Sequence, residues 1–161
     1  MQPSRLILDF HAYWRGLAGG GVPDRELFDP TAVAPMMRGL HIVEMEEGTG
    51  RLRYRMVGTL SDDIAGMSLT GRYLDELFTG PTERSARFFD EIYRRIALTG
   101  IPEAGEYTWP SPNGTEKLIM FGVFPFRVSG AIRQFFYLED LSDLHAKRRK
   151  DPWWVKPIGT P

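Results

Sequence analysis

The sequence predicts an α+β fold in which an antiparallel sheet carries helices on one face, with an additional helix at the N-terminus. Strand-like segments come in pairs joined by short turns, and a short turn makes its two strands antiparallel. The helical segments gather between the strand pairs instead of alternating with single strands, which is typical of α+β domains. With 161 residues, 42% of them hydrophobic and 25% charged, the chain can bury the core of one domain.

Residues 1–28 are predicted to form a helix and a loop that precede the main domain. The apolar positions that recur there at helical spacing are Leu6, Phe10, Trp14 and Leu17. Three consecutive glycines, Gly19 to Gly21, end this pattern, because a helix does not propagate through them. The helix is therefore expected to stop well before the main domain begins.

Residues 29–145 are predicted to form the main domain. Asp29 and Pro30 open a short helix, since aspartate caps helices and proline suits the first helical position. A long helix over residues 81–98 carries one apolar stripe and ends before Gly100. Strands are expected over residues 41–46, 51–58, 106–109, 116–128 and 131–139.

The strand over residues 51–58 is predicted to have one apolar face and one basic face. Leu52, Tyr54 and Met56 alternate with three arginines along it. Successive side chains of a strand point to opposite faces, so the three apolar residues are expected to share the face that meets the helices.

Arg55, on the basic face of that strand, has two interpretations. It is expected to lie deeper than the two arginines nearer the turn, and a buried guanidinium needs a carboxylate or carbonyl partner. The favoured interpretation is a structural ion pair with Asp75 or Glu76. The other interpretation is that Arg55 binds an anionic ligand.

The two last predicted strands, 116–128 and 131–139, are apolar on both faces. A sheet of this kind needs a cover on each side, because a large apolar face left in water is unfavourable. The N-terminal helix can supply the second cover through Phe10, Trp14 and Leu17, either in the same chain or across a dimer.

The absence of cysteine excludes disulfides, thiolate metal sites and cysteine nucleophiles. No histidine pair has the spacing of a helical zinc site, and no glycine-framed serine of the hydrolase type occurs. His41 is the strongest histidine candidate for a direct role, because it begins a strand. The longest apolar run, residues 118–126, is about half of what a membrane span needs, and no secretory signal opens the chain, so we expect a cytoplasmic protein.

Residues 146–161 are predicted to form a basic tail that contains tryptophan. The net charge is -1, yet the last fifteen residues hold five basic residues and one acidic residue. Such a tail can contact an anionic membrane surface weakly, or nucleic acid without sequence specificity. The favoured interpretation is a solvated helix end followed by coil, with Trp153 and Trp154 docked on the domain or a neighbour. Neither a specific nucleic-acid partner nor a transmembrane segment is expected.

Four short motifs occur in an order that resembles PAS domains. They are a Tyr-Trp pair at 13–14, an Asp-Pro pair at 29–30, a Tyr-Arg-x-x-Gly-Thr strand at 54–59 and a Leu-Thr-Gly-Arg turn at 69–72. Together they are similar to a divergent alphaproteobacterial family of stand-alone PAS-like proteins, over residues 6–140. The Gly-Arg turn followed by a leucine-rich helix is also shared with ordinary PAS domains.

This resemblance implies a five-stranded antiparallel sheet, with the long helix packed across one face and a small-molecule pocket between them. It also implies a sensory or regulatory module without catalysis of its own, which binds a small ligand or a protein partner, forms a homodimer and acts through a signalling partner. The lack of cysteine excludes a cysteinyl flavin and a thioester-linked chromophore. Haem is not expected, because residues 61–98 contain no histidine, and that region usually holds the ligand of haem-binding PAS domains. A non-covalent flavin or a small organic ligand remains.

The candidate ligand-binding residues are those on the faces expected to meet the helices, together with the neighbouring arginine. They are Tyr54, Arg55, Met56, Phe88, Ile92, Met120 and Phe136. Each apolar member also suits a plain core position, where burial contributes about 1.5–3 kcal/mol. No catalytic or metal-ligating residue is assigned. The alternative hypothesis is a small α+β enzyme whose pocket uses Arg55, His41 or a carboxylate.

Overall fold

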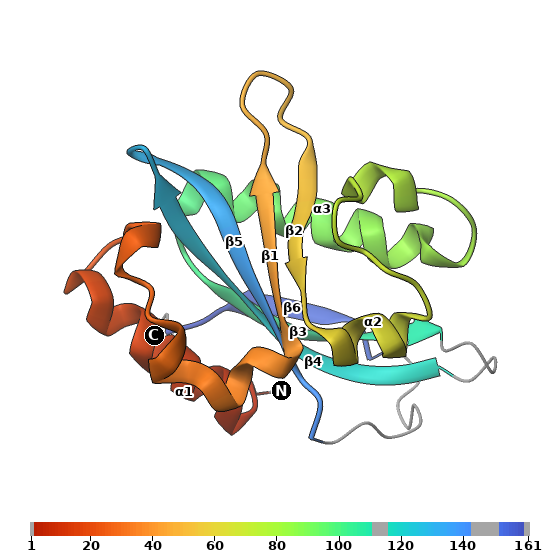
Figure 1. The fold of residues 1–161 in the computed structure, drawn as a ribbon. Coiled ribbons are helices and arrows are strands. Elements are labelled where there is room, and N and C mark those ends of the chain that lie inside the picture. Colours follow the sequence, from red (N-terminus) through yellow and green to blue (C-terminus); the bar gives the residue numbers. More distant parts are fainter. Residues whose placement is uncertain (1, 111–115, 143–151, 160–161) are drawn as a thin grey trace.

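Figure 1 shows the computed structural model of the chain, which describes residues 2–110, 116–142 and 152–159. Within these residues, six strands form one antiparallel sheet in the order β2-β1-β5-β4-β3-β6. The strands are β1 (Leu40–Met45), β2 (Leu52–Val57), β3 (Glu103–Pro110), β4 (Glu116–Val128), β5 (Ala131–Asp140) and β6 (Trp154–Pro157). The predicted α+β fold is confirmed, including its antiparallel sheet and its N-terminal helix.

Three α-helices and four short 3-10 helices accompany the sheet in the described residues. They are α1 (Arg5–Ala18), η1 (Arg25–Leu27), η2 (Pro30–Gly39), α2 (Thr59–Ala65), η3 (Leu74–Leu77), η4 (Gly80–Thr82) and α3 (Glu83–Thr99). The Ser4 hydroxyl caps the start of α1 by accepting a hydrogen bond from the Ile7 N–H, and Gly19 ends the helix at a φ of 65°. None of these helices combines the length and the apolar composition needed to cross a membrane.

The sheet has one strand more than the five that were expected. β6 comes from the predicted tail and pairs antiparallel with β3, at the edge of the sheet. The expected coil is therefore wrong for residues 154–157. The indole N–H of Trp154 donates to Glu106 Oε1 of the neighbouring strand at 2.8 Å, and this bond helps to hold the added strand.

Trp153, which directly precedes β6, docks on the same domain. Its ring centroid lies 5.1 Å from that of Phe88 on α3 and 5.7 Å from that of Tyr107 on β3. The expectation that the tail tryptophans dock on the domain is confirmed for this residue and for Trp154. The basic run at 147–150 lies outside the described residues.

Helices cover both faces of the sheet (Figure 1), and a separate hydrophobic layer lies on each face. On one face α3 packs over strand residues that include Phe121 and Phe135. On the other face α1 packs over residues that include Phe124 and Phe136. The N-terminal helix thus covers the second face within the same chain, which decides between the two arrangements that the sequence leaves open.

The contact between α1 and the sheet depends on a close approach at Gly122 of β4. A Cβ atom at this position would lie 2.8 Å from Ile7 Cγ2 and 2.9 Å from the Phe124 ring, closer than real Cβ contacts come. The indole N–H of Trp14 also donates to the Pro125 carbonyl at 2.8 Å. Close packing and this buried hydrogen bond therefore hold α1 against the sheet.

A β-bulge in β2 changes which of its side chains share a face. Ile42 of β1 pairs with Met56, but the next residue, Val43, pairs with Tyr54, so Arg55 is the extra residue. Tyr54 consequently belongs to the layer under α3, whereas Met56 packs against the layer under α1. The prediction that these two side chains share a face is wrong, because strict alternation does not continue through a bulge.

The expected ion pair of Arg55 with Asp75 or Glu76 is also wrong. Asp75 is instead paired with Arg51, whose guanidinium donates two hydrogen bonds of 2.8 and 2.7 Å to the carboxylate. The Arg55 side chain is 53% exposed, and its Nε lies 3.7 Å from Glu44 Oε2. Since the bulge places it on the outside, its charge needs no buried partner.

The docking of α1 predicts unequal effects for two apolar residues of that helix. Phe10 is fully buried, whereas Leu8 is 39% exposed. We expect Phe10→Ala to lower the free energy of unfolding by about 3–5 kcal/mol, and Leu8→Ala to change it by about 0.5 kcal/mol. Urea unfolding followed by circular dichroism measures both, and equal losses would contradict the docked position of α1.

Candidate functional site

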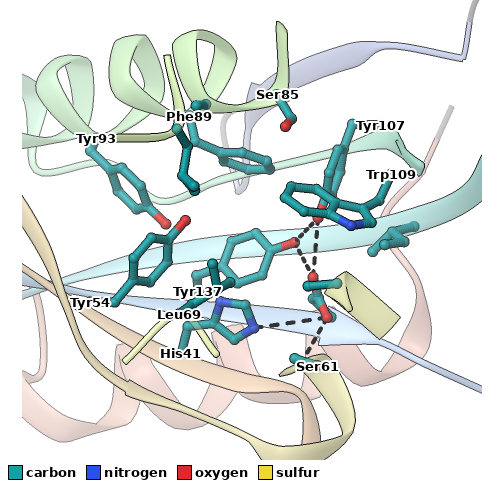
Figure 2. Close-up of a pocket in the computed structure, with 15 residues that line it drawn as sticks. His41, Tyr54, Ser61, Leu69, Ser85, Phe89, Tyr93, Tyr107, Trp109 and Tyr137 are labelled. Atoms are coloured by element: carbon teal, nitrogen blue, oxygen red, sulfur yellow. Dashed lines mark hydrogen bonds and ion pairs between the residues drawn. The ribbon is translucent and has the colours of Figure 1, made fainter. Parts of the chain in front are cut away.

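A small cavity lies between α3 and the sheet (Figure 2). Its volume is about 30 Å³, which is room for about two water molecules. The side chains that line it are His41, Tyr54, Ser61, Ala65, Leu69, Leu77, Ser85, Ala86, Phe89, Tyr93, Tyr107, Trp109, Ile119, Tyr137 and Glu139. The cavity occupies the place that the PAS resemblance implies for a pocket.

Glu139 brings a carboxylate into the wall of this cavity, although only 5% of the residue is exposed. Its Oε1 accepts hydrogen bonds from the hydroxyls of Tyr137 at 2.6 Å and Tyr107 at 3.1 Å, which are themselves 2.8 Å apart. Its Oε2 accepts from the Ser61 hydroxyl of α2 at 2.9 Å. Hydroxyl groups from three separate elements thus take the place of water around one carboxylate.

His41 of β1 lies beside this carboxylate without bonding to it. Its Nε2 is 3.9 Å from Glu139 Oε2, which is too long for a hydrogen bond. Burial lowers the pKa of His41, and the nearby Glu139 and Asp62 charges only oppose that effect. The imidazole is therefore neutral at pH 7, so the contact is not an ion pair.

The four tyrosines of the cavity keep their protons. Burial is the largest cause that raises the pKa of Tyr54, Tyr93, Tyr107 and Tyr137, and the Glu139 charge raises all four further. Figure 2 shows the hydroxyls of Tyr54 and Tyr93 pointing toward one another at the end of the cavity away from Ser61. All four side chains therefore offer neutral hydroxyl groups at ordinary pH.

Two buried nitrogen atoms of the lining lack a hydrogen-bond partner among the described residues. They are His41 Nε2 and Trp109 Nε1. A buried polar atom without a partner costs about 1–3 kcal/mol, so most such atoms in folded proteins are paired. Both nitrogens belong to side chains that line the cavity, so a water or ligand bound there is placed to satisfy them.

The rest of the lining is aromatic or small. The Phe89 ring of α3 stands nearly perpendicular to those of Tyr107 and Tyr137, with centroids 4.8 and 5.1 Å away. Ala65 and Ala86 contribute little volume and so leave space next to these rings. The cavity therefore combines aromatic walls with a small number of polar atoms, as ligand sites in proteins do.

Of the seven residues that the sequence suggests, the structure brings only Tyr54 to the cavity lining. Phe88 and Ile92 belong to the same hydrophobic layer but do not line the cavity. Met56 and Phe136 belong to the layer under α1. Met120 alternates with Ile119 and Phe121 of the α3 layer and so shares the α1 side, while Arg55 is exposed.

Sequence reasoning misses the polar centre of the cavity, although it singles out His41. The missed residues are Ser61, Tyr107, Trp109, Tyr137 and Glu139. One signal could have found part of it: in an otherwise apolar strand, Glu139 follows Tyr137 by two positions and so shares its face. A carboxylate on the core face of an interior strand needs partners there.

The cavity does not fit a large cofactor. A space for about two water molecules excludes the ring systems of a flavin or a haem unless the lining moves. Within the part of the chain that the structure describes, no three His, Cys, Asp or Glu side chains gather to hold a metal ion. The site as it stands suits a compact ligand.

Solved structures of the same fold include VqmA. The VqmA dimer of Vibrio cholerae in the absence of target DNA is 17% identical, with a TM-score of 0.53, and the match covers 70% of this chain and 51% of that chain. VqmA bound to DPO is 19% identical, with a TM-score of 0.53, over 70% of this chain and 57% of that chain. The match thus spans just over half of these solved chains, and at such identities it shows the fold alone.

A family profile gives the closer assignment. No curated protein matches the sequence significantly. The profile of the PAS domain matches residues 2–116, which is well over half of the chain. The order of motifs and the cavity between sheet and long helix agree with this match, and the chain therefore belongs to the PAS domain family.

Proposed function

We propose that this chain is a sensory or regulatory module that binds a small ligand in the cavity between α3 and the sheet. One observation carries the proposal: two buried nitrogens without a partner among the described residues, His41 Nε2 and Trp109 Nε1, lie in the same cavity as the Glu139 carboxylate. This arrangement is not expected in a core that serves only for stability, because each buried polar atom without a hydrogen bond lowers the free energy of unfolding. A ligand that bonds to them recovers that cost.

The PAS domain family is sensory, so a small enzyme is not carried further as an alternative. Of the residues that the enzyme hypothesis used, Arg55 is 53% exposed and does not line the cavity. His41 and a carboxylate, Glu139, do meet there. In the proposed function they recognise a ligand instead of transferring its protons.

Self-association and a signalling partner are part of the proposal, together with a cytoplasmic location. The solved VqmA structure is described as a dimer, which motivates the first expectation without establishing it here. The outer face of the sheet is already covered by α1 of the same chain. A dimer of this chain therefore has to use a surface other than a bare sheet face.

If the cavity holds a ligand, the purified chain should release a small molecule when it is denatured. We expect mass spectrometry of the denatured, purified chain to detect one compound in near-stoichiometric amount. Ala86→Leu should abolish it, because three added carbons fill a cavity of about 30 Å³. Ala97 lies on the same helix outside the lining, so Ala97→Leu serves as the matched control.

Circular dichroism should show that both leucine variants keep the fold. Equal release from the two variants would place the ligand elsewhere. Absence of any compound, together with no shift in unfolding temperature on screening metabolites, would contradict the sensory proposal and leave the cavity to water.

Self-association predicts a mass of twice the 18.4 kDa chain. We expect size-exclusion chromatography with multi-angle light scattering to give that value at micromolar concentration and lower values on dilution. A mass of one chain at every concentration would contradict the dimer and leave ligand binding untouched.

The buried neutral His41 predicts a pH dependence of stability. Because burial holds its pKa below 6.5 in the folded chain, the unfolded chain takes up the proton first as the pH falls. The stability is fully present above about pH 6.5 and is lost below it, by up to about 1.4 kcal/mol per pH unit for one group. We expect urea unfolding between pH 7 and pH 5 to give a steeper loss for the natural chain than for His41→Gln.

His11 contributes a similar but separate slope, since burial also lowers its pKa and Arg15 adds to that effect. It lies on α1, on the other face of the sheet, and it is still present in His41→Gln. Identical slopes for the natural chain and His41→Gln would show that folding does not lower the pKa of His41.

A further inference from the structure

We propose that the cavity selects a compact organic cation that carries N–H groups. This inference rests on the proposed function and names its ligand class. It follows from the charge at the cavity, from the acceptor atoms that remain free there and from the aromatic walls. Each of these three observations favours a cation over a neutral or anionic molecule of the same shape.

The first observation is an uncompensated buried charge. Among the described residues, Glu139 is the only acidic residue of the lining, and no lysine or arginine lines the cavity. Three hydroxyls donate to its two oxygens, so the carboxylate is the acceptor in each of these hydrogen bonds. The nearest basic group, His41, is neutral, so the carboxylate gains hydrogen bonds from its neighbours but no opposite charge.

The second observation is a free acceptor position beside a free nitrogen. An ionised carboxylate offers about four lone-pair sites, and three donors occupy Glu139. Oε2 accepts only from Ser61 among the described residues, and the unpartnered His41 Nε2 lies 3.9 Å from it. When the imidazole proton is on Nδ1, Nε2 is an acceptor, so two N–H groups of one ligand can donate to both atoms. The Trp109 indole N–H is a donor only, so it needs a separate acceptor, which a water beside the ligand can supply.

The third observation is the aromatic wall. Six rings other than His41 line the cavity, and they are Tyr54, Phe89, Tyr93, Tyr107, Trp109 and Tyr137. The face of an aromatic ring attracts a cation by about 0.5–2 kcal/mol, most strongly where water is excluded. An anion meets the opposite effect, and it is also repelled by the carboxylate. The rings and Glu139 therefore act in the same direction.

The cavity has room for about two water molecules, so this proposal is tested with very small probes, and a probe of four non-hydrogen atoms also requires a small movement of the lining. Acetamidinium, acetamide and acetate are planar molecules of four non-hydrogen atoms that differ mainly in charge. Each is titrated into the full chain at constant ionic strength, and binding is followed by the NMR signal of the Trp109 indole N–H. The chain has four tryptophans, so loss of one indole signal in Trp109→Phe assigns it.

We expect acetamidinium to shift this signal with at least tenfold higher affinity than acetamide, and acetate to cause no shift. Glu139→Gln should remove the tenfold preference. Glu44→Gln, the same change on a carboxylate outside the lining, should keep it. The comparison of the three probes on the natural chain needs no variant, so it stands even where Glu139→Gln unfolds.

Equal or tighter binding of acetamide or acetate would overturn the cation proposal while supporting a ligand site. Absence of a shift from all three probes would also overturn it. The proposed function is tested separately. It is supported if the denatured natural chain releases a small molecule that the Ala86→Leu variant does not contain, and it is contradicted otherwise.

Discussion

Strands β4 and β5 carry large apolar side chains on both faces of the sheet, and the need to cover both faces shapes the rest of the molecule. Phe121 and Phe135 point to one side, while Phe124 and Phe136 point to the other, and all four are buried. Each such burial contributes about 1.5–3 kcal/mol, so neither face can be left in water without a large loss. One helix alone cannot cover both.

The two covers meet the sheet in different ways. On the α1 side, the helix approaches closely at Gly122, and the packed side chains are mainly apolar, with Trp14 bonded to a backbone carbonyl and His11 packed against Trp14 and Phe124. On the α3 side, polar groups from α2, β1, β3 and β5 enter the layer. The α1 side is therefore held mainly by apolar packing, whereas the α3 side contains a cavity lined by buried polar groups.

The polar groups of that second side are arranged around one carboxylate. Replacing Glu139 by an apolar residue would orphan the hydroxyls of Tyr107, Tyr137 and Ser61, which now donate to it. Keeping it means holding a negative charge away from water without a cationic partner among the lining residues. Glu139 and its three hydroxyl partners therefore depend on one another, since removing either the carboxylate or a hydroxyl leaves a buried polar group without its hydrogen bond.

The sequence predicts the segments of this fold better than their faces. Five strands and the long helix are readable because turns and apolar periodicity are local signals. The bulge at Arg55 is not readable, since it depends on how β1 pairs with β2, and it moves Met56 away from Tyr54. The site is missed for a related reason. Its polar residues lie on two strands, Tyr107 on β3 and Tyr137 and Glu139 on β5, and they come together only because both strands pair with β4.

The edge strand β6 extends the influence of this site beyond the cavity. Tyr107 donates to Glu139 on one side, and on the other its ring packs 5.7 Å from that of Trp153. Trp153 also packs edge-to-face against Phe88 and lies under the Arg84 guanidinium of α3, and it leads directly into β6. A displacement of the Tyr107 ring at the cavity would therefore move the Trp153 ring that packs beside β6, because close-packed interiors transmit such displacements.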